Sequence, residues 1–285
     1  MTPVSPLTQG ALLIVLSEMF LVGSGMIIRQ VSADLPIEVI VLMRNLLSLV
    51  WMLPWILKYG QRDLPTQRIH LHFMRALIGV TAMSCLFYSW ANLPLGQQAM
   101  LKQTGPFFVP IIALWWLKES ISVRVKVAIL VGFTGVALIL QPQEGALHLA
   151  VFVGLVGAML GALAKVTIRS MRGSESPQKI VFYFALFGSL LAAIPASLNW
   201  VMPSAEHFVW LFGLAATSTL AQLLLTRAYG LAPAGQLGPF TYASVIFATL
   251  MGWLIWQEVV NLLTFIGIAI VCLAAVIMLR GKLQT

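Results

Sequence analysis

Residues 10–31 read GALLIVLSEMFLVGSGMIIRQV, and only Glu18 and Arg29 in this run are charged. A helix needs about 20 largely apolar residues to cross the hydrocarbon core of a membrane, because no water is present there to satisfy an open backbone. The run therefore predicts a membrane-spanning helix.

Nine more apolar runs of similar length follow along the 285 residues. Hydrophobic residues make up 60% of the chain and charged residues 9%, whereas a soluble domain carries about 25% charged residues. This composition excludes a soluble protein and predicts an all-α integral membrane protein with ten transmembrane helices. Besides 10–31, the predicted spans are 36–57, 72–92, 96–117, 123–141, 146–168, 178–199, 207–229, 235–256 and 260–279.

Lysine and arginine gather in every second loop between the predicted spans. Cytoplasmic loops collect these residues, so the pattern predicts that both termini are cytoplasmic. We therefore interpret the net charge of +8 as a signal for the orientation of the protein in the membrane. It does not indicate nucleic-acid binding, because the basic residues are spread over separate loops. They are Lys58, Arg62 and Arg68 after the second span, Lys118, Arg124 and Lys126 after the fourth, Arg169, Arg172 and Lys179 after the sixth, and Arg280 and Lys282 at the C-terminus.

The second half of the sequence repeats features of the first half. The residues Pro94-Leu-Gly-Gln97 are matched 139 residues later by Pro233-Ala-Gly-Gln236, and Glu119 is matched by Glu258 at the same offset. Each half contains five predicted spans, an odd number, so the halves are expected in opposite orientations. Inverted repeats of this kind are common in secondary transporters. The predicted repeats are residues 1–142 and 143–285, which together form one transport unit.

Several stretches resemble the EamA branch of the drug/metabolite transporter (DMT) superfamily. They are Arg75-Ala-Leu-Ile-Gly79, Leu93–Ala99, Thr104–Pro110, Arg227–Tyr242 and Trp256-Gln-Glu258. The resemblance implies a ten-helix bundle with cytoplasmic termini and a central cavity lined mainly by spans 1, 3, 4, 6, 8 and 9. It does not give the substrate, because the branch includes carriers that resemble amino-acid exporters, S-adenosylmethionine carriers and multidrug exporters.

Lys102 is the first candidate for binding the solute, since an ionisable group inside a membrane is costly and usually functional. Gln98 lies one turn before it on the same helical face. Two interpretations stay open for the ammonium group of Lys102. It binds a carboxylate or phosphate of the solute, or it forms an ion pair, for instance with Glu18.

Glu18 and Arg44 are the other charged residues deep in predicted spans. Glu18 is the leading candidate for a residue that binds and releases a coupling proton. An arginine at the position of Arg44 is common in the family whatever the substrate, so we expect Arg44 to hold the bundle together. The basic residues nearer to span ends are expected to extend to the lipid headgroups. They are Arg29, Arg75 and Lys165.

Prolines and glycines interrupt the fourth and ninth spans. Each proline removes a hydrogen bond within its helix, and interrupted helices at corresponding places in two repeats often mark a transport site. The predicted gating or hinge residues are Gly105, Pro106, Pro110, Gly238 and Pro239. Kinks that only serve packing are the alternative.

Polar and aromatic side chains on spans 3, 8 and 9 complete the predicted cavity. They are Tyr88, Trp90, Gln222, Thr241 and Tyr242. Each has a plain alternative, because aromatic residues on helices often pack against neighbours or lie at the membrane interface.

The sequence thus predicts a secondary carrier for small polar metabolites, such as amino acids or related organic acids and zwitterions, in a bacterial-type inner membrane. Its partners are a small-molecule solute, the lipid bilayer and a possible coupling proton. An exporter of aromatic or drug-like compounds and an S-adenosylmethionine-type carrier are the alternatives within this class; a non-transport membrane enzyme or scaffold is the alternative outside it. The sequence has no catalytic motif, so we expect no enzyme activity, catalytic residue, metal or cofactor.

Overall fold

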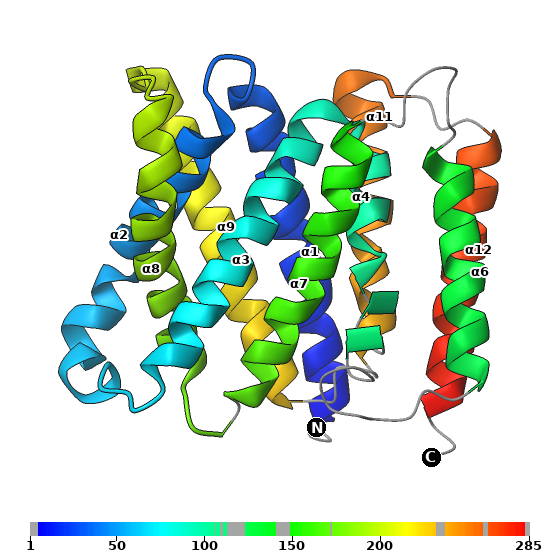
Figure 1. Ribbon diagram of the computed structural model, residues 1–285, viewed down its shortest axis with the longest axis horizontal. Helices are drawn as coiled ribbons and strands as arrows, with labels where there is room; N and C mark the ends of the chain where they lie inside the picture. The colour runs from blue at the N-terminus through cyan, green and yellow to red at the C-terminus, as the bar shows by residue number, and fades with distance from the viewer. Residues whose placement is uncertain are drawn as a thin grey trace.

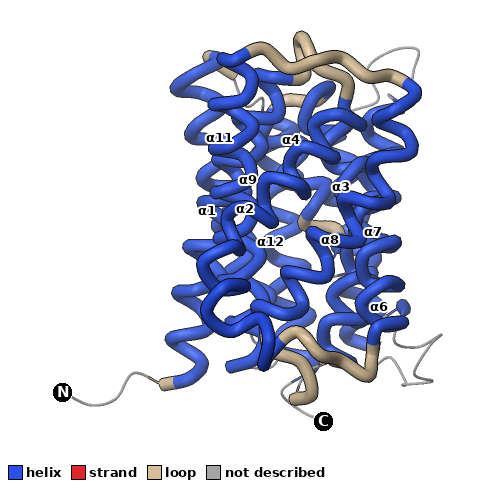
Figure 2. Tube along the Cα trace, turned by 90° about the vertical axis from the view of Figure 1, so that its left-hand side faces the viewer, coloured by secondary structure: helices blue, strands red, loops and turns tan. Residues whose placement is uncertain are grey.

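The computed structural model describes residues 5–105, 107, 108, 111, 112, 123–140, 149–171, 173–231, 237–258 and 262–282. All regular elements in these residues are helices, and they lie side by side with their loops gathered at two ends of the bundle (Figures 1 and 2). The start of α1 and the end of α12 lie at the same end, which we call the terminal end. The six longest of these helices are apolar enough to cross a membrane.

Most of the helices begin and end within a few residues of the predicted spans, but α2 extends to Asp63 instead of residue 57 and α4 ends at Lys102 instead of residue 117. In the first half they are α1 (Pro6–Val31), α2 (Ile37–Asp63), α3 (Ile69–Asn92), α4 (Leu95–Lys102) and α6 (Val123–Leu140). In the second half they are α7 (Leu149–Ser170), α8 (Pro177–Leu198), α9 (Ala205–Leu231), the 3₁₀ helix η1 (Gly238–Tyr242), α11 (Ala243–Trp256) and α12 (Leu262–Lys282).

Local sequence signals explain where two of these helices begin. Ser5 precedes α1 and its hydroxyl accepts a hydrogen bond from the amide of Thr8 at 3.2 Å. Ser176 does the same for Lys179 at the start of α8, at 3.3 Å. In both cases a proline follows the serine, as is common at the first position of a helix.

The helices pair mainly across the two halves of the chain. The most extensive contacts join α1 to α9, α3 to α7, α2 to α8 and α6 to α12. In the first pair, Ser17 donates to the carbonyl of Ala221 at 2.8 Å, and Ser24 shares a hydrogen bond with Thr217 at 2.9 Å. Residue numbers rise in one helix as they fall in the other, so α1 and α9 are antiparallel.

The helices α3 and α7 are also antiparallel. Ser89, near the end of α3, donates to the carbonyl of Ala150 at the start of α7 at 2.7 Å. At the other end, Arg68 donates to the carbonyl of Ser170 at 3.3 Å. Because the ring of Trp90 packs on Gly25, α3 ends at the same side of the bundle as α1. It follows that α1 and α7 run in opposite directions.

The fourth and ninth spans are not continuous α-helices. The helix α4 ends at Lys102 and a turn follows at Gln103 and Thr104. In the described part of the ninth span, the 3₁₀ helix η1 follows Leu237, and the helix α11 starts at Ala243. Of the predicted hinge residues, Gly105 is buried in the helical segment after the turn, while Gly238 and Pro239 begin η1. Pro106 and Pro110 lie outside the described residues.

The distribution of side chains is the reverse of that in a soluble protein. Leu57 and Leu198 are 78% and 80% exposed, whereas Glu18 and Arg44 are 1% and 2% exposed. A soluble protein rarely buries charges while it exposes many large apolar residues. The chain is therefore a multi-pass membrane protein, and its polar interior is where a site must be sought.

Candidate functional site

An ion pair joins α1 to the end of α4 inside the bundle. The ammonium group of Lys102 lies 2.5 Å from the carboxylate of Glu18. The Glu18 side chain is almost wholly buried, and that of Lys102 retains 15% of its exposure. Of the two interpretations of Lys102, the ion pair is therefore the one that this structure contains, and solute binding would compete with it.

Lys165 of α7 adds a second positive charge near this pair. It lies within electrostatic range of both Glu18 and Lys102. The expected extension of Lys165 to the headgroups is therefore not what the structure shows. The centre therefore holds two lysines and one carboxylate, and Lys102 is the lysine that contacts Glu18.

Arg44 is bound by polar groups of two helices. Its Nε donates to the hydroxyl of Ser218 at 2.8 Å, and its Nη1 donates to the side-chain carbonyl of Asn45 at 3.0 Å. The guanidinium also lies 5.4 Å from the ring centre of Phe184. These contacts join α2 to α8 and α9.

Arg75 points into the bundle instead of toward the headgroups, which corrects the expectation from sequence. Only 5% of the residue is exposed. Its Nη2 donates to the amide oxygen of Gln222 on α9 at 3.4 Å, and its Cζ lies 4.2 Å from the ring centre of Phe184. The position of Arg75 along its helix predicts how deep it lies in the membrane but not which way its side chain points, because a residue near a span end can face either the lipid or the bundle.

Gln103 connects the two interrupted spans. Its side-chain nitrogen donates to the carbonyl of Thr241 and to the hydroxyl of Ser244, each at 2.7 Å. The hydroxyl of Thr241 in turn donates to the side-chain oxygen of Gln103 at 2.8 Å. Sequence reasoning selected Thr241 but missed Gln103. Its position two residues before the Gly105-Pro106 pair was the signal that could have found it.

The remaining predicted residues lie inside the bundle without forming one cluster with Lys102. Gln98 is fully buried, and both polar atoms of its amide lack a partner among the described residues. Tyr88 packs against the main hydrophobic core. Trp90 packs on Gly25 and Phe87. Tyr88 and Trp90 therefore make packing contacts. The hydroxyl of Tyr242 is buried and has no hydrogen-bond partner in the described part of the chain.

A polar contact closes the end of the bundle opposite the terminal end. The carboxylate of Glu258, just after α11, forms an ion pair with Arg29 of α1. Its second oxygen accepts a hydrogen bond from the amide of Leu95 at 3.1 Å, at the start of α4. The Arg29 guanidinium also lies over the ring of Trp256 at 4.8 Å. Three helices that approach each other here are thus tied through one carboxylate.

A second polar contact ties two loops at the terminal end. Glu175, between α7 and α8, accepts a hydrogen bond from Thr66 at 2.6 Å and pairs with Lys179 at 2.9 Å. Lys179 also donates to the carbonyl of Pro65 at 3.0 Å, and the ring nitrogen of His72 lies 3.7 Å from the Glu175 carboxylate. Burial alone would raise the pKa of Glu175, but the hydrogen bonds from Thr66 and Lys179, with the nearby positive charge, hold it below 4.5.

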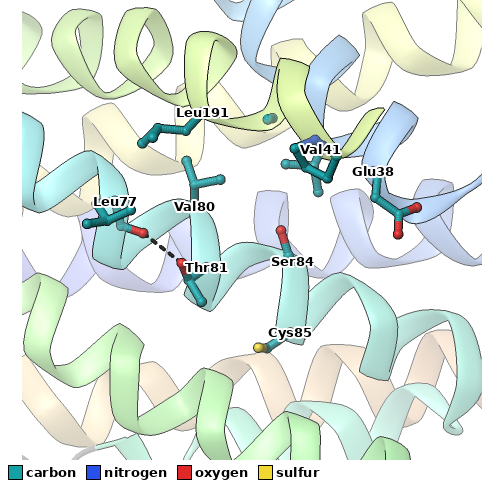
Figure 3. A pocket seen from close by; sticks show the side chains of 10 residues that line it. Glu38, Val41, Leu77, Val80, Thr81, Ser84, Cys85 and Leu191 are labelled. Atoms are coloured by element: carbon teal, nitrogen blue, oxygen red, sulfur yellow. Dashed lines mark hydrogen bonds between the residues drawn. The ribbon is translucent and has the colours of Figure 1, made fainter. Parts of the chain in front are cut away.

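One pocket of about 260 Å³ lies between α2, α3 and α8 (Figure 3). Its lining is mostly apolar and includes Val41, Leu77 and Leu191, with Glu38 as a charged group at one side. Thr81 in its wall donates to the carbonyl of Leu77 at 2.9 Å. Because its described lining contains no cation and none of the predicted binding residues, the charged centre is the better candidate site.

Comparison with known proteins finds two matches to one family model. Residues 8–141 and 148–280 each match the EamA-like transporter family. The chain is 30% identical over 281 residues to the pseudopaline exporter CntI of Pseudomonas aeruginosa, covering 97% of this chain and 98% of that protein. It is also 29% identical over 252 residues to a riboflavin transporter of Vibrio cholerae, covering 86% and 83%.

Two further comparisons are consistent with these. An S-adenosylmethionine uptake transporter of Rickettsia bellii is 24% identical over 240 residues, which cover 84% of this chain and 82% of that protein. A solved crystal structure superimposes with a TM-score of 0.67 at 14% sequence identity, covering 98% of this chain and 99% of the other. The latter similarity concerns the fold alone. The named relatives carry different solutes, so similarity by itself does not select a substrate.

Proposed function

Since the chain belongs to the EamA-like transporter family of the DMT superfamily, we propose that it is a secondary carrier of small polar metabolites that works by alternating access. The solute class that we favour is an amino acid or a related organic acid or zwitterion. The observation that carries this choice is the buried pair of Glu18 and Lys102, with Lys165 nearby.

A zwitterion fits the chemistry of this pair. A carboxylate of the solute replaces Glu18 as the partner of Lys102, and an amino group of the solute takes the place of Lys102 beside Glu18. The pair is buried, so separating it without such replacement would leave two uncompensated charges at a large cost. A solute with a carboxylate but no amino group is helped by Lys165, which lies near the same centre and can pair with a carboxylate there.

The helix pairing supports two inverted five-helix repeats, residues 1–142 and 143–285. A two-fold axis that exchanges the halves would convert the pair α1 and α9 into the pair α7 and α3, and both pairs are extensive. The pairs α2 with α8 and α6 with α12 would each be converted into themselves. Rocking of the halves about this axis would expose the charged centre alternately to the two sides of the membrane.

The expected orientation in the inner membrane places the terminal end in the cytoplasm. Arg62 in the last turn of α2, Arg68 in the loop before α3 and Lys179 in the first turn of α8 lie at this end, and positive residues favour the cytoplasmic side. Single cysteines at Ser174 and at Asn199, in loops at opposite ends, test this in intact cells. A membrane-impermeant thiol reagent added outside should label the cysteine at 199 and not that at 174, on a background in which Cys85 and Cys272 are replaced. Labelling of the cysteine at 174 alone would show that the terminal end lies outside the cell, opposite to the proposed orientation.

A proton is the coupling ion that the site could use, and Glu18 is the residue that would bind it. Protonation of Glu18 would release Lys102 for a carboxylate, so that proton and solute bind together. The test is uptake into liposomes driven by a pH gradient. A Glu18→Gln protein should lose the gradient-driven component and keep counterflow. Full gradient-driven uptake by this variant would contradict the role of Glu18.

The carrier function is tested with the purified full-length chain in liposomes. A thermal-shift screen with amino acids, nucleosides and cationic dyes selects the solutes, and saturable uptake with counterflow establishes transport. In Lys102→Ala, the apparent affinity for carboxylate solutes, measured by thermal stabilisation, should fall at least tenfold, because the carboxylate of the solute loses its partner. Lys126→Ala, which removes an exposed lysine of α6, is the matched control and should behave as the wild type.

Two results would contradict the proposal. If Lys102→Ala responds to carboxylate solutes as the wild type does, the assignment of the solute class fails. If dyes or aromatic compounds stabilise the protein and carboxylates do not, the chain is an exporter of drug-like compounds. Absence of solute movement with every class would favour a membrane enzyme or scaffold.

A further inference from the structure

Two buried guanidinium groups lie on the ring of Phe184. The Cζ atoms of Arg44 and Arg75 are 5.4 and 4.2 Å from its centre, and the two residues are 2% and 5% exposed. In the part of the chain that the structure describes, neither arginine forms an ion pair with a carboxylate. A buried charge without a counter-ion is costly, so this pair of arginines calls for an anion.

The two arginines differ in how well their nitrogen atoms are satisfied. Arg44 donates to Ser218 and Asn45 at 2.8 and 3.0 Å. Arg75 has one long hydrogen bond to Gln222, at 3.4 Å, and its Nε and Nη1 have no partner among the described residues. Unsatisfied buried polar groups are rare in folded proteins. Arg75 is therefore the arginine that is available to a ligand.

Gly79 permits the observed position of the Arg75 side chain. It lies one turn after Arg75 on α3, and a Cβ there would overlap the Nη1 atom of Arg75 and approach the ring of Phe184 to 2.8 Å. Any side chain at this position would displace the guanidinium. The glycine thus leaves room for a buried arginine that folds back along its own helix.

The contact between Arg75 and Gln222 can be placed relative to the Glu18–Lys102 pair through α9 and α1. Gln222 follows Ala221, and the carbonyl of Ala221 is bound by Ser17, the neighbour of Glu18, at 2.8 Å. Gln222 and Glu18 are therefore at the same level of two adjacent helices. A single small solute could contact both positions.

We propose that Arg75 and Gln222 form a second anion-binding subsite, so that the preferred solutes carry two acidic groups, one bound by Lys102 and the other by Arg75. This inference rests on the proposed function and narrows its solute class to dicarboxylates and acidic zwitterions. A guanidinium offers several donors in one plane, which suits a carboxylate better than the point charge of a lysine does. The amide of Gln222 can donate to the same carboxylate once its oxygen is released from Arg75.

The probes for this subsite are linear dicarboxylates from malonate to pimelate, each compared with the monocarboxylate of equal carbon number. Thermal stability of the purified full-length chain in detergent, titrated with each probe at constant ionic strength, gives an apparent affinity. At the best chain length, the wild type should bind the dicarboxylate at least tenfold more tightly than the monocarboxylate. Arg75→Gln should reduce this ratio to about threefold or less, while monocarboxylate binding persists.

Two further variants separate binding from folding. Gly79→Ala keeps the charge of Arg75 but displaces its guanidinium, and it should reduce the ratio as Arg75→Gln does. Arg75→Lys keeps the positive charge but lacks the planar guanidinium, so it should give an intermediate ratio. Three different substitutions thus test the site, and any one of them that folds gives a result. Arg68→Gln, which removes an arginine in the loop before the same helix, is the matched control and should keep the wild-type ratio.

The outcomes are distinguishable from those of the proposed function. If the wild-type ratio is near one, or if it is unchanged in Arg75→Gln and Gly79→Ala, the second subsite does not exist, although carboxylate transport through Lys102 can stand. If chloride or inorganic phosphate stabilises the wild type as strongly as the dicarboxylates, and Arg75→Gln removes that effect, Arg75 holds a free anion and the inference is overturned. If no carboxylate of either series binds, the proposed function fails as well.

Discussion

Gln103 and Thr241 exchange two hydrogen bonds at the places where the fourth and ninth spans are interrupted. The amide nitrogen of Gln103 lies 2.7 Å from the Thr241 carbonyl, and the Thr241 hydroxyl lies 2.8 Å from the amide oxygen of Gln103. A helix that ends inside a membrane leaves backbone groups without partners. A side chain from the first half of the chain thus satisfies a carbonyl freed in the second half, and the two interruptions depend on each other.

Replacement of Gln103 by alanine should therefore destabilise the protein. Loss of a buried hydrogen-bonding partner costs about 1–3 kcal/mol, and here the carbonyl of Thr241 loses a donor. The measurement is the free energy of unfolding in mixed detergent micelles. Thr134→Ala serves as the control, because Thr134 is exposed and bonds only to Leu130 of its own helix in the described contacts; it should stay within about 0.5 kcal/mol of the wild type. Equal effects of the two changes would contradict this role of Gln103.

The pair of Glu18 and Lys102 should show strong coupling in a double-mutant cycle. Glu18→Gln or Lys102→Gln alone leaves one buried charge unpaired, which typically costs about 3–5 kcal/mol. The double variant leaves neither charge, so it should be more stable than the sum of the single effects predicts. Unfolding of the four proteins at one pH measures this. Additive effects would show that the two groups do not interact in solution.

Substitution at two glycines of α1 should have opposite effects. A Cβ at Gly25 would lie 2.7 Å from the Trp90 ring, whereas a Cβ at Gly23 would meet no atom within 4 Å. We expect Gly25→Ala to destabilise by about 1–3 kcal/mol through overpacking. Gly23→Ala should be neutral or stabilise by up to about 1 kcal/mol, because alanine favours the helix. Melting temperatures rank the two variants, and the reverse ranking would mean that Trp90 does not pack on α1.

The contact between the two loops at the terminal end should depend on pH through Glu175. The pKa of this residue is lowered in the folded protein below its ordinary value of 4.5, because hydrogen bonds from Thr66 and Lys179 outweigh the effect of burial. A lowered pKa means that the ionised form stabilises the fold above pH 4.5, and this contribution is lost as the pH falls through the folded-state pKa.

Glu175→Gln is the variant that tests this dependence. Its stability relative to the wild type should be lowest at neutral pH, and the difference should shrink as the pH falls below 4.5. Melting curves of both proteins across pH 3–7 provide the comparison, with Glu38→Gln as a control at a carboxylate on the other side of the bundle. A difference that stays constant down to the lowest pH would contradict the stabilising role of the Glu175 charge.

Sequence reasoning predicted the spans well, because length and apolar content alone determine which segments can cross a bilayer. It also anticipated that Glu18 and Lys102 could pair, since both lie deep in their spans. It did not place Arg75 or Lys165, because depth along a helix leaves the facing direction open. Gln103 was missed for a different reason: its partners Thr241 and Ser244 are distant in sequence, and only the packing of the two halves brings them together.

The pairing of helices across the two halves has a consequence for how the chain is made. The main partners of α1, α2, α3 and α6 all come from the second half of the sequence. When the ribosome has released only the first half, Ser17 and Arg44 lack their acceptors on α9, and Arg44 keeps only its hydrogen bond to Asn45. The first half must therefore be held near the insertion site until α9 is made, and a message truncated in the middle should yield a fragment that is degraded rather than a half-sized carrier.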